Sequence, residues 1–140
     1  MPKQNTSPSL SKLAQESIIL RLPTLEAQVA AWIKAAESDL VHRSLHLHRR
    51  GFKAYVRRAR HNLDGRVVET LDIASISIPE KEQGRGWFKS FRRIVEALNP
   101  WEATYYESVL NPRFEAYFHK EGLPSDGSGF YVMRASTVRT

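Results

Sequence analysis

The sequence has no cysteine among its 140 residues. A disulfide framework, a cysteine-ligated metal site and a thiol nucleophile are therefore all excluded. No apolar run approaches the roughly 20 residues that a membrane-spanning helix needs, and the amino-terminal segment lacks the apolar stretch of a signal peptide. From these absences we expect a cytoplasmic protein that does not act at a membrane.

Acidic residues are in the minority, with 15 of them against 21 lysines and arginines, and the formal net charge is +6. This charge favours an anionic partner, such as a nucleic acid, an anionic cofactor or an acidic protein surface. The length suits one domain with a single core. We expect a disordered tail over residues 1–11 and one domain over residues 12–140.

The first half of the chain predicts a helix followed by a hairpin. Thr24 is a favoured N-cap for a helix whose apolar spacing extends to about His42. Alternating residues then predict a strand over Phe52–Arg60, and turn residues at 62–65 connect it to a second strand that reaches Ile78. This second strand is long, so we expect a bulge in it near Asp72.

The second half alternates helices and strands. Apolar spacing predicts a helix over Trp87–Leu98, with Trp87, Phe91, Ile94, Val95 and Leu98 on its buried stripe. A strand is expected over Thr104–Leu110, a helix from Pro112 to Gly122, and a last strand over Phe130–Arg134. The order predicts a mixed α/β fold with at least one crossover connection and with helices packed on the sheet.

Three histidines follow the first predicted helix. His42 and His46 are four residues apart, which on a helix would place two imidazoles beside one metal ion. No acidic residue or cysteine stands within the segment from His42 to Arg50, and the charge of that segment is positive, which repels a cation. We interpret His42, His46 and His48 as packed or solvated side chains.

The segment from Lys81 to Gly86 carries the chemical signal. It follows a strand closed by Pro79, contains Gly84 and Gly86, and opens directly into a helix at Trp87. A strand, a glycine turn and a helix in this order direct free backbone N–H groups and the positive end of a helix dipole at one spot, which favours a phosphate. The alternative is a glycine turn without a ligand, since the segment matches neither a P-loop nor a dinucleotide fingerprint.

This segment resembles the GNAT superfamily of acyl-CoA-dependent N-acyltransferases. In that family, arginine or glutamine leads a loop with small residues three and five positions later, and Lys81, Gly84 and Gly86 are similar, with lysine as a departure. A later signature, an asparagine that opens a helix ending in glycine, is similar to Asn111 and Gly122. The resemblance covers about residues 69–123.

The resemblance implies a fold, a cofactor and a reaction. The fold would be α/β (α+β), an abbreviated GNAT-like mixed and mostly antiparallel sheet with helices on both faces. The protein would transfer an acetyl group from acetyl-CoA to an amine of a protein or small molecule, with an acidic acceptor favoured by the basic hairpin. The implied cofactor-binding residues are Ile76, Ile78, Lys81, Gln83, Gly84, Arg85, Gly86, Trp87 and Asn111.

Two catalytic roles are also implied. A strand glutamate often deprotonates the amine in this family, and Glu69 is our candidate, with Asp72 as its competitor on the opposite strand face. The family's proton-donating tyrosine falls at Phe118 when counted from Asn111, so Tyr117 is the candidate donor. Other hydroxyl or imidazole donors would be Tyr105, Tyr106 and His119.

Alternatives follow from the places where the pattern departs from the family. Phe118 favours a catalytically weak interaction module that regulates a partner protein. The basic hairpin also allows nucleic-acid binding, as the less favoured function. Strands expected in the family are missing, so either a strand is hidden, with residues 17–22 as the best candidate, or a homodimer completes the sheet.

Overall fold

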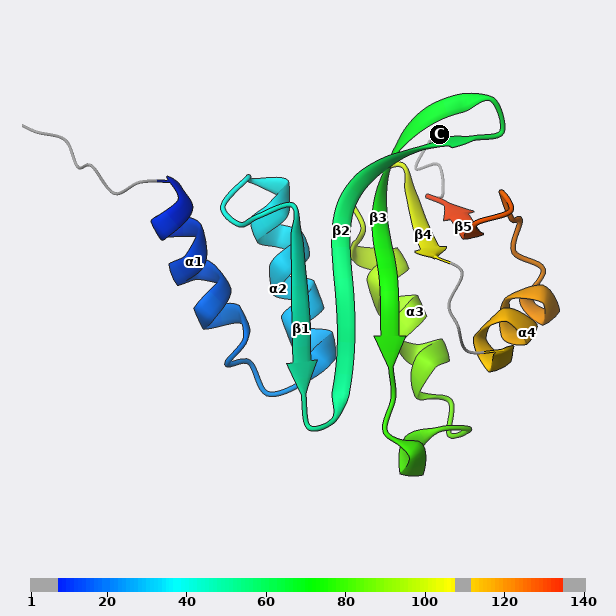
Figure 1. Ribbon diagram of the computed structural model, residues 1–140, viewed down its shortest axis with the longest axis horizontal. Helices are drawn as coiled ribbons and strands as arrows, with labels where there is room; N and C mark the ends of the chain where they lie inside the picture. Colours follow the sequence, from blue (N-terminus) through cyan, green and yellow to red (C-terminus); the bar gives the residue numbers. More distant parts are fainter. Residues whose placement is uncertain (1–7, 108–111, 135–140) are drawn as a thin grey trace, which may run out of the picture.

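The computed structural model describes residues 8–107 and 112–134 as five strands, four α-helices and a short 3-10 turn (Figure 1). The sheet order is β1-β2-β3-β4-β5, and only the β3–β4 pair is parallel. The predicted mixed, mostly antiparallel sheet with one crossover is confirmed. The element bounds are α1 Pro8–Ile19, α2 Leu25–Glu37, β1 Ser44–Arg49, β2 Phe52–Leu63, β3 Arg66–Ser77, α3 Trp87–Leu98, β4 Ala103–Glu107, α4 Pro112–Glu121 and β5 Gly129–Met133.

The chain begins differently from our prediction. Residues 8–11, which we assigned to a disordered tail, lie in α1, and so do residues 17–19 of the segment that we considered a hidden strand. Ile19 is buried in the core, and the Glu16 carboxylate accepts a bond from the His42 backbone N–H at 2.7 Å. These contacts to residues far along the chain stabilise a helix there.

Helix α2 begins where predicted and ends earlier. The Thr24 hydroxyl accepts a hydrogen bond from the Ala27 N–H at 3.0 Å, which confirms the N-cap. The helix stops at Glu37 because Asp39 adopts a left-handed conformation with φ 60°, and the Leu40 N–H returns to the Ala35 carbonyl. This is a Schellman-type end, which the apolar spacing alone does not reveal.

The predicted hairpin is confirmed as β2 and β3, joined by a two-residue turn. Asp64 and Gly65 both have positive φ, as tight hairpin turns require. The expected bulge lies at Ala74, two residues beyond Asp72, because Tyr55 pairs with Ser75 while Val56 pairs with Ile73. The bulge lies close to the point where β3 leaves β4.

Strand β1, like helix α1, is an element that we did not predict from the sequence. Its Leu47 is buried while His46 and His48 are exposed, so the histidines belong to a strand face. The buried Gln28 side chain of α2 accepts from the His48 N–H at 3.2 Å and donates to the His48 carbonyl at 3.1 Å. An α2 side chain therefore satisfies part of the open edge of the sheet. Three strands now precede Pro79, as the family resemblance implies.

The helices lie on one side of the sheet. Helix α2 packs against β1, β2 and α3, and α4 reaches the same side because Phe118 stacks between Tyr106 of β4 and Phe130 of β5. Among the described residues the opposite side carries no helix and is covered in part by the curled end of the β2–β3 hairpin (Figure 1). The prediction of helices on both faces is wrong in this respect.

Helix α3 has the predicted bounds but a different buried stripe. Phe88, Phe91 and Val95 are buried, whereas Ile94 and Leu98 are 36% and 47% exposed. The helix is rotated toward α4, which Phe88 contacts. The last predicted elements are confirmed as β4, α4 and β5, and residues 108–110 of the predicted strand lie outside the described part. None of the described helices has the length and apolarity to cross a membrane.

Candidate functional site

The site lies where two parallel strands part. β3 pairs with β4 only from Thr70 to Ile73, and it then continues to Ser77 without a described strand on that side. A strand that leaves its neighbour exposes backbone groups that the sheet no longer uses. Ile76 and Ser77 therefore lie beyond the described pairing of β3 with β4.

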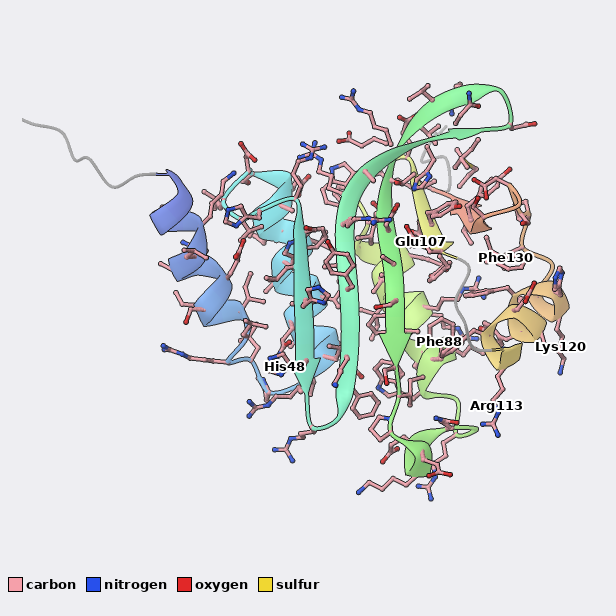
Figure 2. All side chains as sticks on the ribbon, viewed as in Figure 1. His48, Phe88, Glu107, Arg113, Lys120 and Phe130 are labelled. Atoms are coloured by element: carbon pink, nitrogen blue, oxygen red, sulfur yellow. The ribbon has the colours of Figure 1, made fainter. Side chains whose placement is uncertain are left out.

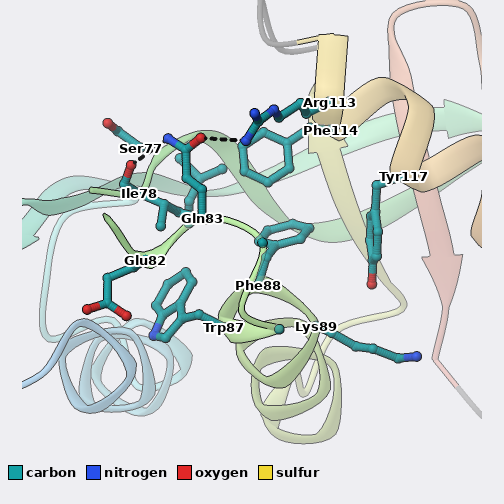
Figure 3. A pocket seen from close by; sticks show the side chains of 13 residues that line it. Ser77, Ile78, Glu82, Gln83, Trp87, Phe88, Lys89, Arg113, Phe114 and Tyr117 are labelled. Carbon is teal, nitrogen blue, oxygen red and sulfur yellow. Dashed lines mark hydrogen bonds between the residues drawn. The ribbon is translucent and has the colours of Figure 1, made fainter. Parts of the chain in front are cut away.

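A pocket of about 400 Å³ opens at this splay, between α3 and α4 (Figure 3). The structure brings six of the nine predicted cofactor-binding residues to its wall. Lys81 and Arg85 are exposed on the same loop without lining the pocket, and Asn111 lies outside the described residues. The lining residues are Ile76, Ser77, Ile78, Glu82, Gln83, Gly84, Gly86, Trp87, Phe88, Lys89, Arg113, Phe114 and Tyr117.

The glycine loop forms one end of the pocket. A 3-10 turn over Glu80–Glu82 leads into Gly84 and Gly86, whose φ angles of 78° and 83° favour glycine. Gly86 is the N-cap of α3, so the first N–H groups of that helix have no intrahelical acceptor. A Cβ at either glycine would meet nothing within 4 Å, which shows open space above the loop.

Aromatic side chains form the middle of the pocket. The Phe88 ring lies 4.6 Å from that of Phe114 and 5.5 Å from that of Tyr117, measured between centroids. Trp87 stacks on Phe91 and donates its indole N–H to the Glu26 carboxylate of α2 at 3.0 Å. The start of α3 is thus anchored to α2, and the pocket has an apolar wall.

Gln83 connects three parts of the pocket. Its amide nitrogen donates to the Ile78 carbonyl at 3.0 Å, and its amide oxygen accepts from Arg113 at 2.8 Å (Figure 3). The end of β3, the glycine loop and the start of α4 are therefore held together by one side chain. The family resemblance implied a cofactor-binding role for Gln83, but its reach to α4 is a tertiary feature that the sequence does not indicate.

Tyr117 closes the other end of the pocket and is held by charged groups. Its hydroxyl accepts a hydrogen bond from Arg92 Nη1 at 3.2 Å, and Arg92 Nε bonds the Glu96 carboxylate at 2.6 Å. Burial opposes the charge of Arg92, but the hydrogen bond and the charge of Glu96 outweigh it and raise the pKa of Arg92. The hydroxyl of Tyr106 donates to Glu96 at 2.5 Å, and burial together with this carboxylate raises the pKa of Tyr106.

Phe118, which occupies the family's tyrosine position by count, points into the core. It is 2% exposed, and it packs against Phe88, Tyr106 and Phe130. Tyr117, one residue earlier, lines the pocket instead. Among the other named donors, Tyr105 lies on the opposite sheet face and Tyr106 is buried beside Glu96, while His119 contacts Phe130.

Glu69 is not brought to the pocket. It lies seven residues from Ile76 along β3, about 23 Å at the usual rise of a strand, and its carboxylate accepts from Arg58 Nε at 2.6 Å. Arg58 also donates to the Ala36 carbonyl at 3.1 Å, so the pair links the hairpin to α2.

Asp72, the competitor of Glu69, is fully buried on the sheet face opposite α3. Its carboxylate accepts from the Thr70 hydroxyl at 2.6 Å and from Arg57 at 3.2 Å, and it lies 2.8 Å from His61 Nε2. Arg57 is shared with Glu107. Among the described residues no group of three histidine or carboxylate side chains is arranged to hold a metal ion.

Comparisons with known proteins support the fold. No protein-family model matches the chain, and no curated protein matches its sequence. A solved structure of a tyrosine-to-phenylalanine mutant of the toxin AtaT, bound to the C-terminus of the antitoxin AtaR and acetyl-CoA, is similar with a TM-score of 0.50 at 9% identity, over 60% of this chain and 59% of that one. The structure of a KacTA–DNA complex has a TM-score of 0.47 to this chain at 14% identity, over 62% of this chain and 59% of that one.

The similarity to AtaT and the strand order together show a GNAT-like mixed α+β fold. The chain matches about three fifths of the length of that toxin. At 9% identity this likeness shows the fold alone.

Proposed function

We propose that this protein is an acyl-CoA-dependent N-acyltransferase that moves an acetyl group from acetyl-CoA to an amine of a protein or small molecule. The observation that carries the proposal is the pocket at the splay of β3 and β4, with the Gly84–Gly86 loop at one end and Tyr117 at the other. The similar AtaT structure contains acetyl-CoA, which supports the choice of cofactor.

The residues of the pocket fit acetyl-CoA in three respects. The amides of the loop and of the first turn of α3, with Lys81 and Arg85 beside them, would hold the diphosphate. The end of β3 at Ile76 and Ser77, beyond its described pairing with β4, would offer backbone groups to the amides of the pantetheine arm. Phe88 and Phe114 offer an apolar wall to its aliphatic parts.

When bound, acetyl-CoA supplies a thioester carbonyl that is activated for attack by an amine. The Tyr117 hydroxyl would give its proton to the thiolate of CoA as the carbon–sulfur bond breaks, and the attacking amine would lose its proton to solvent. Because Arg92 donates to the Tyr117 oxygen, the phenol proton is directed to another acceptor, and a positioned acid of this kind contributes typically 10²–10⁴-fold to a rate. The proposal does not depend on Glu69, whose carboxylate is paired with Arg58.

Isothermal titration of the full chain with acetyl-CoA and with CoA tests the cofactor. We expect both to bind, and no heat of binding at millimolar cofactor would overturn the proposal. A thiol-release assay with a panel of amines, carried out on the same preparation, tests the transfer.

The second candidate is an interaction module that binds a partner protein and turns over weakly. The hydrogen bond from Arg113 to Gln83 ties α4 to the loop at the pocket, and it would have to break before a ligand could lie between the two. This bond therefore favours the second candidate. The AtaT structure holds a segment of the antitoxin AtaR, which supports a protein as partner. Cofactor binding without release of thiol for any amine would favour the module, and acyl transfer would contradict it.

A further inference from the structure

A second cavity adjoins the proposed cofactor pocket. It measures about 370 Å³ and lies across the three strands β1, β2 and β3, and we call it the β1–β3 groove. Ile76 and Ser77 line both cavities. The end of β3 is therefore the common wall of the pocket and the groove. The other lining residues of the groove are His46, Leu47, His48, Lys53, Ala54 and Ser75.

The polar residues of the groove share one face of the sheet. His48 pairs with Lys53, and Lys53 pairs with Ser77, so these three side chains form one row across the strands. His46 lies in the next row on the same face, where it pairs with Tyr55 and stacks on it with ring centroids 4.1 Å apart. This face carries no helix among the described residues, and the row is exposed (Figure 2, where His48 is labelled).

The charge of the groove is positive and is not balanced by a carboxylate. None of its lining residues is acidic, and within the described chain Lys53 makes no ion pair. The arginines of the hairpin differ in this respect, because Arg57 pairs with Asp72 and Glu107, and Arg58 pairs with Glu69. Much of the basic charge of the hairpin is therefore paired with carboxylates of the same chain, whereas Lys53 is available to a ligand.

We propose that the β1–β3 groove binds the anionic part of the acceptor, so that the acceptor class is a primary amine with carboxylates close to it. This inference rests on the proposed function, because it makes the groove the acceptor side of the same reaction. Lys53 and the histidines would contact the carboxylates while the amine reaches past the end of β3 and along the pocket toward Tyr117. A free acidic amine and the amino terminus of an acidic peptide share this chemistry.

A polymer of phosphates fits the groove less well. Nucleic-acid affinity comes from many uncompensated cations along a continuous track, whereas Asp72, Glu107 and Glu69 interrupt the charge of the hairpin beyond the groove. The cavity has room for a few amino-acid residues rather than for a nucleic-acid strand.

Binding to the full chain is measured by isothermal titration with four probes. These are glutamate, a tetraglutamate peptide with a free amino terminus, the matching tetralysine peptide, and an eight-residue deoxythymidine oligonucleotide. We expect tetraglutamate to bind at least tenfold more tightly than tetralysine. Saturation by glutamate alone would point to a small acceptor, and saturation only by the peptide would point to a protein acceptor. Binding of neither acidic probe, or tighter binding of the oligonucleotide, would overturn the inference.

Variants locate the site. Lys53→Glu should weaken tetraglutamate binding at least tenfold, while Lys34→Glu, at an exposed position on α2, makes the same change of charge away from the groove and should leave it within twofold. Equal losses in the two variants would show a general charge effect and contradict the groove. Titration of the unmodified chain with CoA separates the two proposals: CoA binding without tetraglutamate binding contradicts the groove alone, and the absence of CoA binding contradicts the acyltransferase.

Discussion

The hydroxyl of Tyr117 accepts a hydrogen bond from Nη1 of Arg92 at 3.2 Å, which ties a pocket residue of α4 to α3. Arg92 is in turn held by Glu96, and Glu96 by the buried hydroxyl of Tyr106. The position of the proposed proton donor is therefore set by a chain of contacts that reaches the core.

Tyr117→Phe should lower the turnover number about 100-fold, because it removes the proposed proton donor. It should leave the affinity for acetyl-CoA within threefold, because it removes no large contact with the cofactor. Steady-state kinetics and titration with acetyl-CoA give the two values. Tyr131→Phe, on the other face of the sheet, is the control and should change neither. A Tyr117→Phe variant with unchanged turnover would remove Tyr117 from the role.

Phe118→Tyr should destabilise the fold by about 1–3 kcal/mol, because it places a hydroxyl among the rings of Phe88, Tyr106 and Phe130. It should not raise turnover, although it restores a tyrosine where the family count places one. Urea unfolding and the thiol-release assay measure the two effects. Faster turnover at full stability would show that position 118 reaches the pocket.

Gly84→Val should weaken acetyl-CoA binding at least tenfold, because the Cβ and methyl groups enter the space above the loop and the residue must keep a positive φ. Strain of this kind costs about 1–2 kcal/mol. Gly65→Val, in the hairpin turn with φ 81°, is a matched control with similar strain away from the pocket. Equal losses of cofactor affinity in the two variants would attribute the effect to stability alone.

Glu69→Gln should leave turnover within twofold, because Glu69 is separated from Ile76 by about 23 Å of strand backbone at the usual rise and its carboxylate is paired with Arg58. The expected effect is on stability, up to about 1 kcal/mol for a partly exposed ion pair, and thermal unfolding measures it. A large fall in turnover with normal acetyl-CoA binding would instead restore Glu69 as the base.

The pair formed by Tyr105 and Asp126 should make stability depend on pH at both ends of the range. Burial and the hydrogen bond to Asp126 raise the pKa of Tyr105, so its contribution is complete below about pH 10 and is lost as the pH rises further. Burial opposes the charge of Asp126, but bonds from the Ser128 N–H and the Tyr105 hydroxyl outweigh it and lower its pKa. The contribution of Asp126 to folding stability is present above about pH 4 and is lost as the pH falls through the lowered pKa of its carboxyl group.

Urea unfolding of the wild type and of Asp126→Asn between pH 2 and pH 11 measures this effect. The variant should be less stable at pH 7, and the difference should shrink toward pH 2. A difference that stays constant down to pH 2 would show that the charge of Asp126 has no part in it.

The local features of this protein were determined by its sequence. The Thr24 cap, the Asp64–Gly65 turn, the bounds of α3, and the glycine loop that enters it all depend on residues within a few positions of each other. Capping, turn geometry and helical periodicity act over this range, so a pattern of neighbouring residues predicts them. The GNAT-like fold could be predicted for the same reason, because the loop over Lys81–Gly86 that carries the resemblance is also a pattern of neighbouring residues.

Contacts between distant residues were decided only by the tertiary structure. The alternation of leucine and histidine in β1 covers only a few residues, and that strand forms because β2 pairs with it and Gln28 satisfies its edge. The presence of Tyr117 rather than Phe118 in the pocket depends on the rotation of α4 against Phe88 and Tyr106. The pairing of Glu69 with Arg58, and the free charge of Lys53, follow from strand register, which the order of residues along one strand does not contain.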